Sequence, residues 1–125
     1  MTDKLSGVIL TSRDFKLQNG NVYVTKNNGN PGMLLIWWVA CGHCHHFIPT
    51  FNEIADTIGS DFVCMSIESE SITPDLSSAL GVQGYPSIRF FSQDGKIIGE
   101  YNKERKKDTI LKEICQVYHH CYERH

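Results

Sequence analysis

The chain has 125 residues, of which 41% are hydrophobic and 21% charged, and its formal net charge at pH 7 is −2. This length suits a single domain, residues 1–125, with a core of its own, and it excludes a multidomain machine. The slightly acidic balance removes the usual electrostatic reason to expect nucleic acid or an anionic membrane as the main partner.

No segment of the sequence predicts membrane insertion or export. The longest uninterrupted apolar run, Met33 to Cys41, is far shorter than the ~20 residues that cross a bilayer. Residues 1–6 lack the basic start and apolar stretch of a secretory signal, and residues 122–125 match no retention signal. We therefore expect a cytoplasmic protein with no membrane partner. In a reducing compartment its five cysteines would not form a disulfide framework.

The first half of the chain predicts a strand, a hairpin, a buried strand and a helix. Residues 8–10 form a short apolar strand, and Asn19-Gly20 between two short β-prone segments is a hairpin signal. Residues 34–39 are apolar without alternation, which is typical of a strand covered on both faces. From Cys41 the period becomes helical and continues to Gly59, with Pro49 inside it. The apolar positions of this helix are Phe47, Phe51, Ile54 and Ile58.

The second half predicts three more strands and two helices. The strands are residues 62–67, 87–91 and 97–101, and a short helix over 74–80 is closed by Gly81. A last amphipathic helix runs from Asp108 to about Tyr122, and we expect its apolar side to carry Ile110, Leu111, Ile114, Val117, Tyr118 and Cys121. This order of elements predicts an α/β fold with a mixed central sheet and helices on both faces.

Residues 41–44, Cys-Gly-His-Cys, lie where the buried strand ends and the helix begins. Unpaired N–H groups and the positive end of the dipole favour an anion at a helix start, and such surroundings lower a thiol pKa. His43 can add positive charge and a hydrogen-bond donor. We therefore expect Cys41 to be the outer, attacking sulfur and Cys44, one turn inward, to be the resolving sulfur.

The same pair of cysteines has other interpretations. A structural zinc site needs two further ligands, and Cys64, Cys115, His119, His120 and Cys121 are available, although no second paired motif exists. The pair followed by His45 also matches the haem attachment pattern. Haem attachment usually implies export, and the residues after His45 continue a helix. A purely structural pair has no packing purpose at this junction.

The combination of motifs is more specific than any one of them. Residues 38–44, the helix proline Pro49 and the segment 84–91, Gly-Tyr-Pro-Ser-Ile-Arg-Phe-Phe, resemble the catalytic domain of protein disulfide isomerases, within the thioredoxin superfamily. The resemblance runs from about residue 33 to the end, and more faintly from Val8. It implies a thioredoxin fold. Residues 16–32 do not look like the family's first helix, and we expect a hairpin and loop in its place.

The resemblance also implies roles for single residues. Pro86 matches the family's cis-proline, which faces the cysteine pair and places the backbone of Tyr85 beside it, where a substrate strand pairs. The alternative for Tyr85 and Pro86 is an ordinary turn entering a strand. Arg105 matches an arginine that swings toward the buried sulfur and favours its thiolate, and its alternative is a place in a solvated charge run. The catalytic set is thus Cys41, Gly42, His43, Cys44 and Arg105, and the substrate-binding set is Ala40, Gly84, Tyr85 and Pro86.

Four positions depart from the family pattern. Val39 and Ala40 stand where proline and tryptophan are usual, so the surface beside Cys41 should be flatter and less aromatic. Leu35 occupies the position of the buried carboxylate that relays a proton to and from the inner sulfur. Cys64 takes the place of the paired lysine, and losing both members is self-consistent because a lone buried charge is costly.

The remaining cysteines and histidines are expected to be structural. Cys64, Cys115 and Cys121 should be small apolar groups in a strand and a helix. Cys115 and Cys121, six residues apart on one helix, should point in different directions and should not bond to each other. His119 and His120 are expected to be surface groups at a helix end.

These observations predict a monomeric thiol–disulfide oxidoreductase that acts on protein thiols and disulfides with an external thiol reductant or oxidant system. The redox-active pair Cys41–Cys44 needs no metal or organic cofactor. His43 in place of the proline of reducing thioredoxins indicates the oxidising side of the range from roughly −270 to −180 mV. The alternatives are a peptide-binding adaptor that lost catalysis with Leu35 and Ala40, and a zinc or iron–sulfur protein.

Overall fold

A mixed five-stranded sheet forms the centre of the protein, as a computed structural model shows for residues 4–119 and 121. The strand order is β1-β5-β4-β6-β7. β5 runs parallel to both β1 and β4, whereas β6 runs antiparallel to β4 and β7. The strands are β1 (Val8–Leu10), β4 (Gly32–Trp37), β5 (Val63–Glu68), β6 (Ser87–Phe91) and β7 (Ile97–Glu100).

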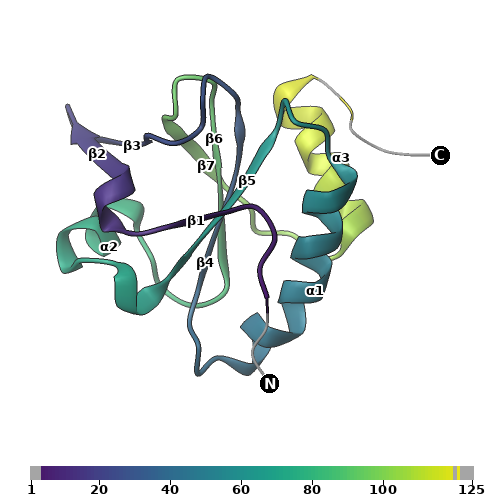
Figure 1. Cartoon of the computed structure of the whole chain (residues 1–125), viewed down its shortest axis with the longest axis horizontal. Coiled ribbons are helices and arrows are strands. Elements are labelled where there is room, and N and C mark those ends of the chain that lie inside the picture. Colours follow the sequence, from purple (N-terminus) through teal and green to yellow (C-terminus); the bar gives the residue numbers. More distant parts are fainter. Residues whose placement is uncertain (1–3, 120, 122–125) are drawn as a thin grey trace.

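Helices cover both faces of this sheet, which confirms the predicted architecture (Figure 1). α1 (Gly42–Thr57) and α3 (Lys107–Tyr118) lie on one face, and α2 (Pro74–Leu80) lies on the other. Two clusters of buried apolar side chains result, one on each face of the sheet. Alternate residues of the central strand β4 enter them, so that Leu35 belongs to the α1 side and Leu34 to the α2 side.

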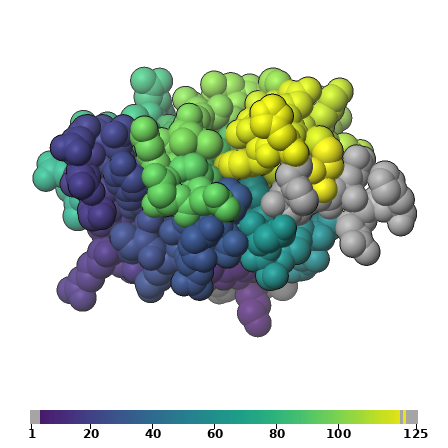
Figure 2. Space-filling model, turned by 90° about the horizontal axis from the view of Figure 1, so that it is seen from above, coloured from purple at the N-terminus to yellow at the C-terminus, as the bar shows by residue number. Residues whose placement is uncertain are grey.

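The predicted hairpin is present and covers the α2 face beside the sheet. β2 (Phe15–Gln18) pairs antiparallel with β3 (Asn21–Val24). Asn19 and Gly20 both have positive φ, 53° and 77°, which is the backbone of the tight hairpin turn that Asn-Gly favours. Figure 2 shows this hairpin beside the turn between β6 and β7, to which it is joined by the N–H of Val24 donating to Gly95.

The central strand β4 begins and ends two residues earlier than its apolar pattern predicts. It pairs with β5 and β6 only as far as Trp37. Trp38 and Val39 follow it as exposed loop residues, with 42% and 50% of their surfaces accessible. The prediction placed Trp38 and Val39 in the strand only because they are apolar. In the structure both lie on the surface and not in the core.

Arg89 is a buried cation that joins α2 to the sheet. Its side chain on β6 is 5% exposed, and its guanidinium donates to the carbonyls of Leu80 and Gly81 at 3.0–3.3 Å. These carbonyls belong to the last turn of α2, where Gly81 closes the helix in the left-handed conformation, as predicted. The carboxylate of Glu100 lies 3.4 Å from the same guanidinium.

We expect Arg89→Met to lower the free energy of unfolding by about 2 kcal/mol or more, because it leaves helix-end carbonyls buried without a donor. Glu100→Gln is the matched control: Glu100 is half-exposed, and breaking an exposed ion pair costs about 1 kcal/mol or less. Urea denaturation of the three proteins measures both effects. Equal stability of Arg89→Met and the parent chain would show that water satisfies these carbonyls.

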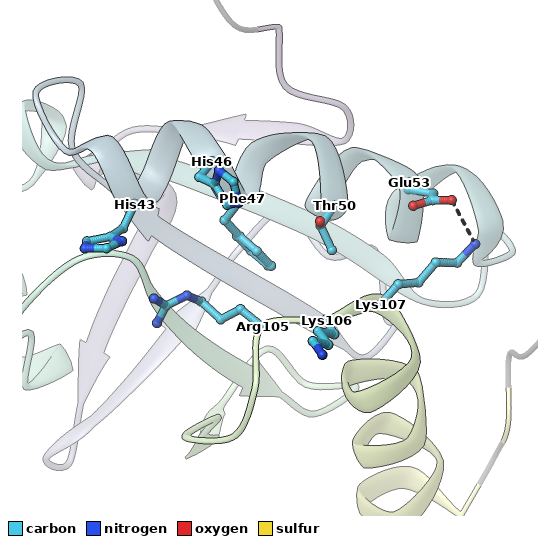
Figure 3. Close-up of a pocket in the computed structure, with 8 residues that line it drawn as sticks. All are labelled: His43, His46, Phe47, Thr50, Glu53, Arg105, Lys106 and Lys107. Atoms are coloured by element: carbon cyan, nitrogen blue, oxygen red, sulfur yellow. Dashed lines mark ion pairs between the residues drawn. The ribbon is translucent and has the colours of Figure 1, made fainter.

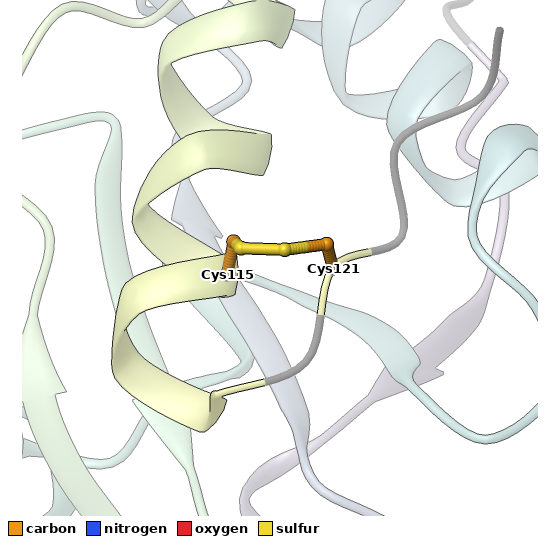
Figure 4. The surroundings of a disulfide bond; sticks show 2 residues. All are labelled: Cys115 and Cys121. Carbon is orange, nitrogen blue, oxygen red and sulfur yellow. A yellow bond between two sulfur atoms is a disulfide. The ribbon is translucent and has the colours of Figure 1, made fainter.

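The C-terminal helix corrects two predictions. α3 ends at Tyr118, and His119 adopts a left-handed backbone that turns the chain out of the helix. Cys121 therefore lies outside the helix, and Cys115 and Cys121 form a disulfide with Cα atoms 4.3 Å apart (Figure 4). The prediction that they would not bond assumed helical spacing for both. Val117 is also more exposed than predicted, and His120 lies outside the described residues.

Within the described part of the chain, no helix has both the length and the apolar character needed to cross a membrane.

Candidate active site

The cysteine pair lies at the junction of β4 and α1. Cys41 is the N-cap of α1, with an extended backbone, and its Sγ accepts a hydrogen bond from the N–H of Cys44 at 3.2 Å. The turn that leads to it is closed by the N–H of Cys41 donating to the carbonyl of Trp38 at 3.0 Å. The sulfur thus sits where the helix N-terminus favours negative charge, as the motif predicts.

The two sulfurs differ in burial and in acidity. Both are free thiols, Cys41 half-buried and Cys44 only 1% exposed. Burial raises the pKa of Cys44 to about 12, and its hydrogen bond with the Cys41 sulfur adds to this effect. At neutral pH Cys44 therefore keeps its proton. This asymmetry supports the predicted order, in which the outer sulfur attacks and the inner one resolves.

Tyr85 and Pro86 come from a distant part of the chain to face the pair. The peptide bond between them is cis. The carbonyl oxygen of Tyr85 lies 3.6 Å from Cys41 Sγ, within reach of the thiol proton. The backbone of Tyr85 thus lies beside the outer sulfur, as the resemblance implies.

Arg105 lies on the loop before α3 and faces the start of α1. In Figure 3 its guanidinium points toward the ring of His43 across a pocket of about 380 Å³. Arg105 also lines a smaller hollow with Pro86, so it stands between the cysteine helix and the cis peptide. Its positive charge lowers the pKa of Cys44, opposing the effect of burial. The electrostatic influence that the resemblance implies for Arg105 is therefore present.

The remaining predicted residues frame the mouth of the site. Ala40, Gly42 and Gly84 are exposed, and apart from their chain neighbours and the local helix backbone no atom lies within 4 Å of where a Cβ would sit on either glycine. These positions leave the approach to Cys41 open. Neither glycine is required here by a close backbone contact.

Two residues that hold the loop before Cys41 were not found from the sequence. The carboxylate of Glu68, at the end of β5, accepts the N–H of Val39 at 2.9 Å, and Nε2 of His45 lies 2.5 Å from the Val39 carbonyl. Glu68 pairs in register with Trp37. The sequence could have indicated Glu68 because it ends β5, the parallel neighbour of β4, at the level where the loop before Cys41 begins.

The interior beneath the site is apolar where the family has charges. Leu35 is fully buried, and it shares the α1-side cluster with Cys64. Burial raises the pKa of Cys64 to about 12, and the charge of Asp56 raises it further. Both departures from the family pattern are thus in the core, and no carboxylate stands at position 35.

In the part of the chain that the structure describes, the other cysteines and histidines are not grouped as metal ligands. Among the residues that the structure describes, no group of three or more His, Cys, Asp and Glu side chains is placed to hold an ion. Cys64 lies within the core, and Cys115 is committed to a disulfide with Cys121.

Comparison with known proteins places this geometry in a family. Residues 14–116 match the family described as Thioredoxin. The chain belongs to the thioredoxin family. This thioredoxin domain is 34% identical over 71 residues to a protein disulfide-isomerase of Zea mays and 32% identical over 86 residues to one of Ricinus communis. These matches cover 57% and 68% of the domain, but only 14% and 17% of the relatives' lengths.

Solved structures show the same fold over most of the thioredoxin domain. The Trx4 domain of ERdj5 aligns with a TM-score of 0.72 at 19% identity, covering 92% of this chain and 97% of that one. Human ERp44 aligns with a TM-score of 0.71 at 15% identity, covering 93% of this chain and 30% of that one. The thioredoxin fold, with its central mixed sheet flanked by helices, is therefore confirmed.

Arg105 provides a prediction about the resolving sulfur. Removing its charge in Arg105→Gln should raise the pKa of Cys44 and leave less of its thiolate at any pH below that value. Because Arg105 is exposed, we expect a modest slowing of the resolution step, about two- to fivefold at neutral pH. Stopped-flow measurement of mixed-disulfide resolution against pH tests this. Arg105→Lys keeps the charge and should keep the rate, whereas equal slowing in both variants would show a steric role instead.

Proposed function

We propose that this chain is a thiol–disulfide oxidoreductase that acts on protein substrates. The observation that carries the proposal is the unequal pair at the N-terminus of α1. Cys41 is half-buried and its Sγ accepts a hydrogen bond from the N–H of Cys44, while Cys44 is buried and protonated. The similarity to protein disulfide isomerases supports the same chemistry.

The exchange proceeds in two steps. The Cys41 thiolate attacks one sulfur of a substrate disulfide, forms a mixed disulfide and releases the other substrate sulfur as a thiolate. Cys44 then transfers its proton to water, and its thiolate attacks Cys41 Sγ, which releases the second substrate thiolate and leaves the Cys41–Cys44 disulfide. An external dithiol reduces this disulfide, and in reverse the same steps deliver a disulfide to a substrate dithiol.

Residues around the pair are proposed to position the substrate. An extended substrate segment would pair with the backbone of Tyr85 beside the cis peptide, close to Cys41 Sγ. Trp38 and Val39 offer exposed apolar surface at the same mouth. His43 and Arg105 would stabilise the thiolates as they form.

The thioredoxin family works through its own disulfide, and we propose that this chain likewise uses no metal or organic cofactor. We also propose that it acts as a monomer with an external thiol reductant or oxidant system. The cytoplasmic location stays a prediction, and microscopy of the tagged chain tests it.

An insulin-reduction assay with dithiothreitol tests the activity, and the reduction potential of the pair tests its direction. We expect catalysed precipitation of the insulin B chain and a potential nearer ~−180 mV than ~−270 mV. A rate equal to that of dithiothreitol alone would contradict the proposal. A reduction potential near ~−270 mV would still fit thiol–disulfide exchange, but it would show that the chain reduces its substrates rather than oxidising them.

A second candidate function, a peptide-binding adaptor, is favoured by the buried Leu35 in place of a proton-relaying carboxylate. The pKa of Cys41, measured by alkylation against pH, separates the two functions. A value near the ~8.5 of a free thiol favours the adaptor, and a value well below it favours the enzyme.

A further inference from the structure

A pocket begins beside the cysteine pair and runs along α1. One wall is the face of α1 from His43 to Glu53, and the opposite wall is the segment 105–107 before and at the start of α3 (Figure 3). The buried ring of Phe47 lies between these walls. The near end of the pocket is lined by His43, which follows Cys41 by two residues, and by Arg105, whose charge acts on Cys44.

The charges of this pocket oppose those of the chain as a whole. The net charge of the chain is −2, yet Arg105, Lys106 and Lys107 line the pocket against the single carboxylate of Glu53. Lys107 lies 3.5 Å from Glu53, and Lys106 lies 3.7 Å from Glu104 outside the pocket. Among the described residues Arg105 forms no ion pair. Positive charge is therefore available beside the sulfurs.

The length of the pocket suits a segment of polypeptide. From His43 to Glu53 the helix advances roughly 15 Å at 1.5 Å per residue. An extended chain covers this distance in about four or five residues. A peptide whose cysteine lies at Cys41 would therefore bring side chains two to four residues away to Arg105, Lys106 and Lys107.

We propose that this pocket docks an acidic segment of the substrate polypeptide that adjoins its reactive cysteine. This inference rests on the proposed function and adds a substrate class to it. The carboxylates of the segment would meet the cations of residues 105–107 while its disulfide reaches Cys41. The pocket thereby favours substrate disulfides whose cysteines are flanked by acidic residues.

Four peptide disulfides test the proposal with dithiothreitol as reductant; each joins two copies of one peptide sequence, one copy labelled with a fluorophore and the other with a quencher. Three carry two Glu, two Gln or two Lys residues at positions two to four from the cysteine, and the fourth carries two Glu residues eight positions away. After subtraction of the uncatalysed rates, we expect kcat/KM for the near-Glu peptide to exceed that for the Gln peptide roughly fivefold, as two exposed ion pairs allow. The advantage should largely disappear at ~300 mM salt.

Paired charge-neutralising variants locate the effect. Lys106→Gln with Lys107→Gln should remove most of the near-Glu advantage and leave turnover of the Gln peptide unchanged. Lys16→Gln with Lys112→Gln changes the net charge equally, but these exposed residues lie on β2 and α3 outside the pocket. This control should keep the advantage.

The outcomes separate docking from catalysis. Equal turnover of all peptides, or an advantage that both double variants lose equally, would overturn the docking proposal and leave the enzyme intact. So would equal preference for the distant-Glu peptide or for glutathione disulfide, because either result indicates general attraction of anions. If the parent chain reduces no peptide, including the Gln peptide, the proposed function itself fails and the docking proposal falls with it.

Discussion

Replacing Cys41 with serine should lower turnover of a protein disulfide by at least ~100-fold, to the rate of the reductant alone. The serine hydroxyl can still accept the N–H of Cys44, so the N-cap and the fold should persist. It cannot form a disulfide, however, and Cys44 cannot replace it, because Cys44 is buried and its pKa is about 12. The insulin-reduction assay measures the loss.

Cys44→Ser should instead trap the first intermediate. Cys41 remains able to attack, but no internal sulfur can resolve the mixed disulfide, so a covalent complex with substrate should accumulate and be visible on a non-reducing gel. Cys64→Ala is the matched control, because Cys64 is another buried free thiol that pairs with Met33 near the start of β4, whereas the cysteine pair follows the end of β4. Cys64→Ala should keep activity. Wild-type turnover in Cys41→Ser would remove the proposed mechanism altogether.

Leu35→Glu should restore a proton relay and speed the resolution step. Cys44 must lose a proton against a pKa raised to about 12, and a carboxylate at position 35 would act as its general base, an effect typically worth ~100-fold or more. Burial raises the pKa of such a carboxyl group, so the gain should appear as pH rises through that pKa and the group ionises. Rapid-quench measurement of mixed-disulfide resolution against pH tests this.

The same change should cost stability, because Leu35 is fully buried in the α1-side cluster. An unpaired buried carboxyl group costs several kcal/mol, more at high pH where it is charged. Leu35→Gln is the control, since it has a similar size and polarity but cannot carry the proton. Unchanged or slower resolution in a well-folded Leu35→Glu protein would show that the relay is supplied elsewhere.

Local signals in the sequence predicted turns and helix ends correctly where a particular residue type favours one backbone conformation. Asn19 and Gly20 adopt positive φ, and Gly81 closes α2 in the left-handed conformation. Boundaries set by hydrophobicity alone were less accurate. The strand predicted to end at Val39 ends at Trp37, because apolar residues also occur on the surface of a site.

The helix end gives the clearest failure of a local argument. Helical spacing was extended through Cys121, and the predicted separation of Cys115 and Cys121 followed from it. The chain leaves the helix at His119, which allows the disulfide. A single residue in a left-handed conformation changed which side chains meet, and no periodic pattern in the sequence indicates that residue.

By itself the sequence determined the place of the cysteine pair at the start of a helix, the cis-proline and the α/β order of elements, because spacing, turn chemistry and family motifs are local properties. The tertiary structure decided which distant groups surround the site. The Tyr85 carbonyl and the Arg105 charge act on the sulfurs, the Glu68 carboxylate holds the Val39 loop, and the cations of residues 105–107 face α1. Those contacts depend on the pairing of strands and the packing of α3 against the sheet. Electrostatic influence falls with distance in space, not with separation along the chain.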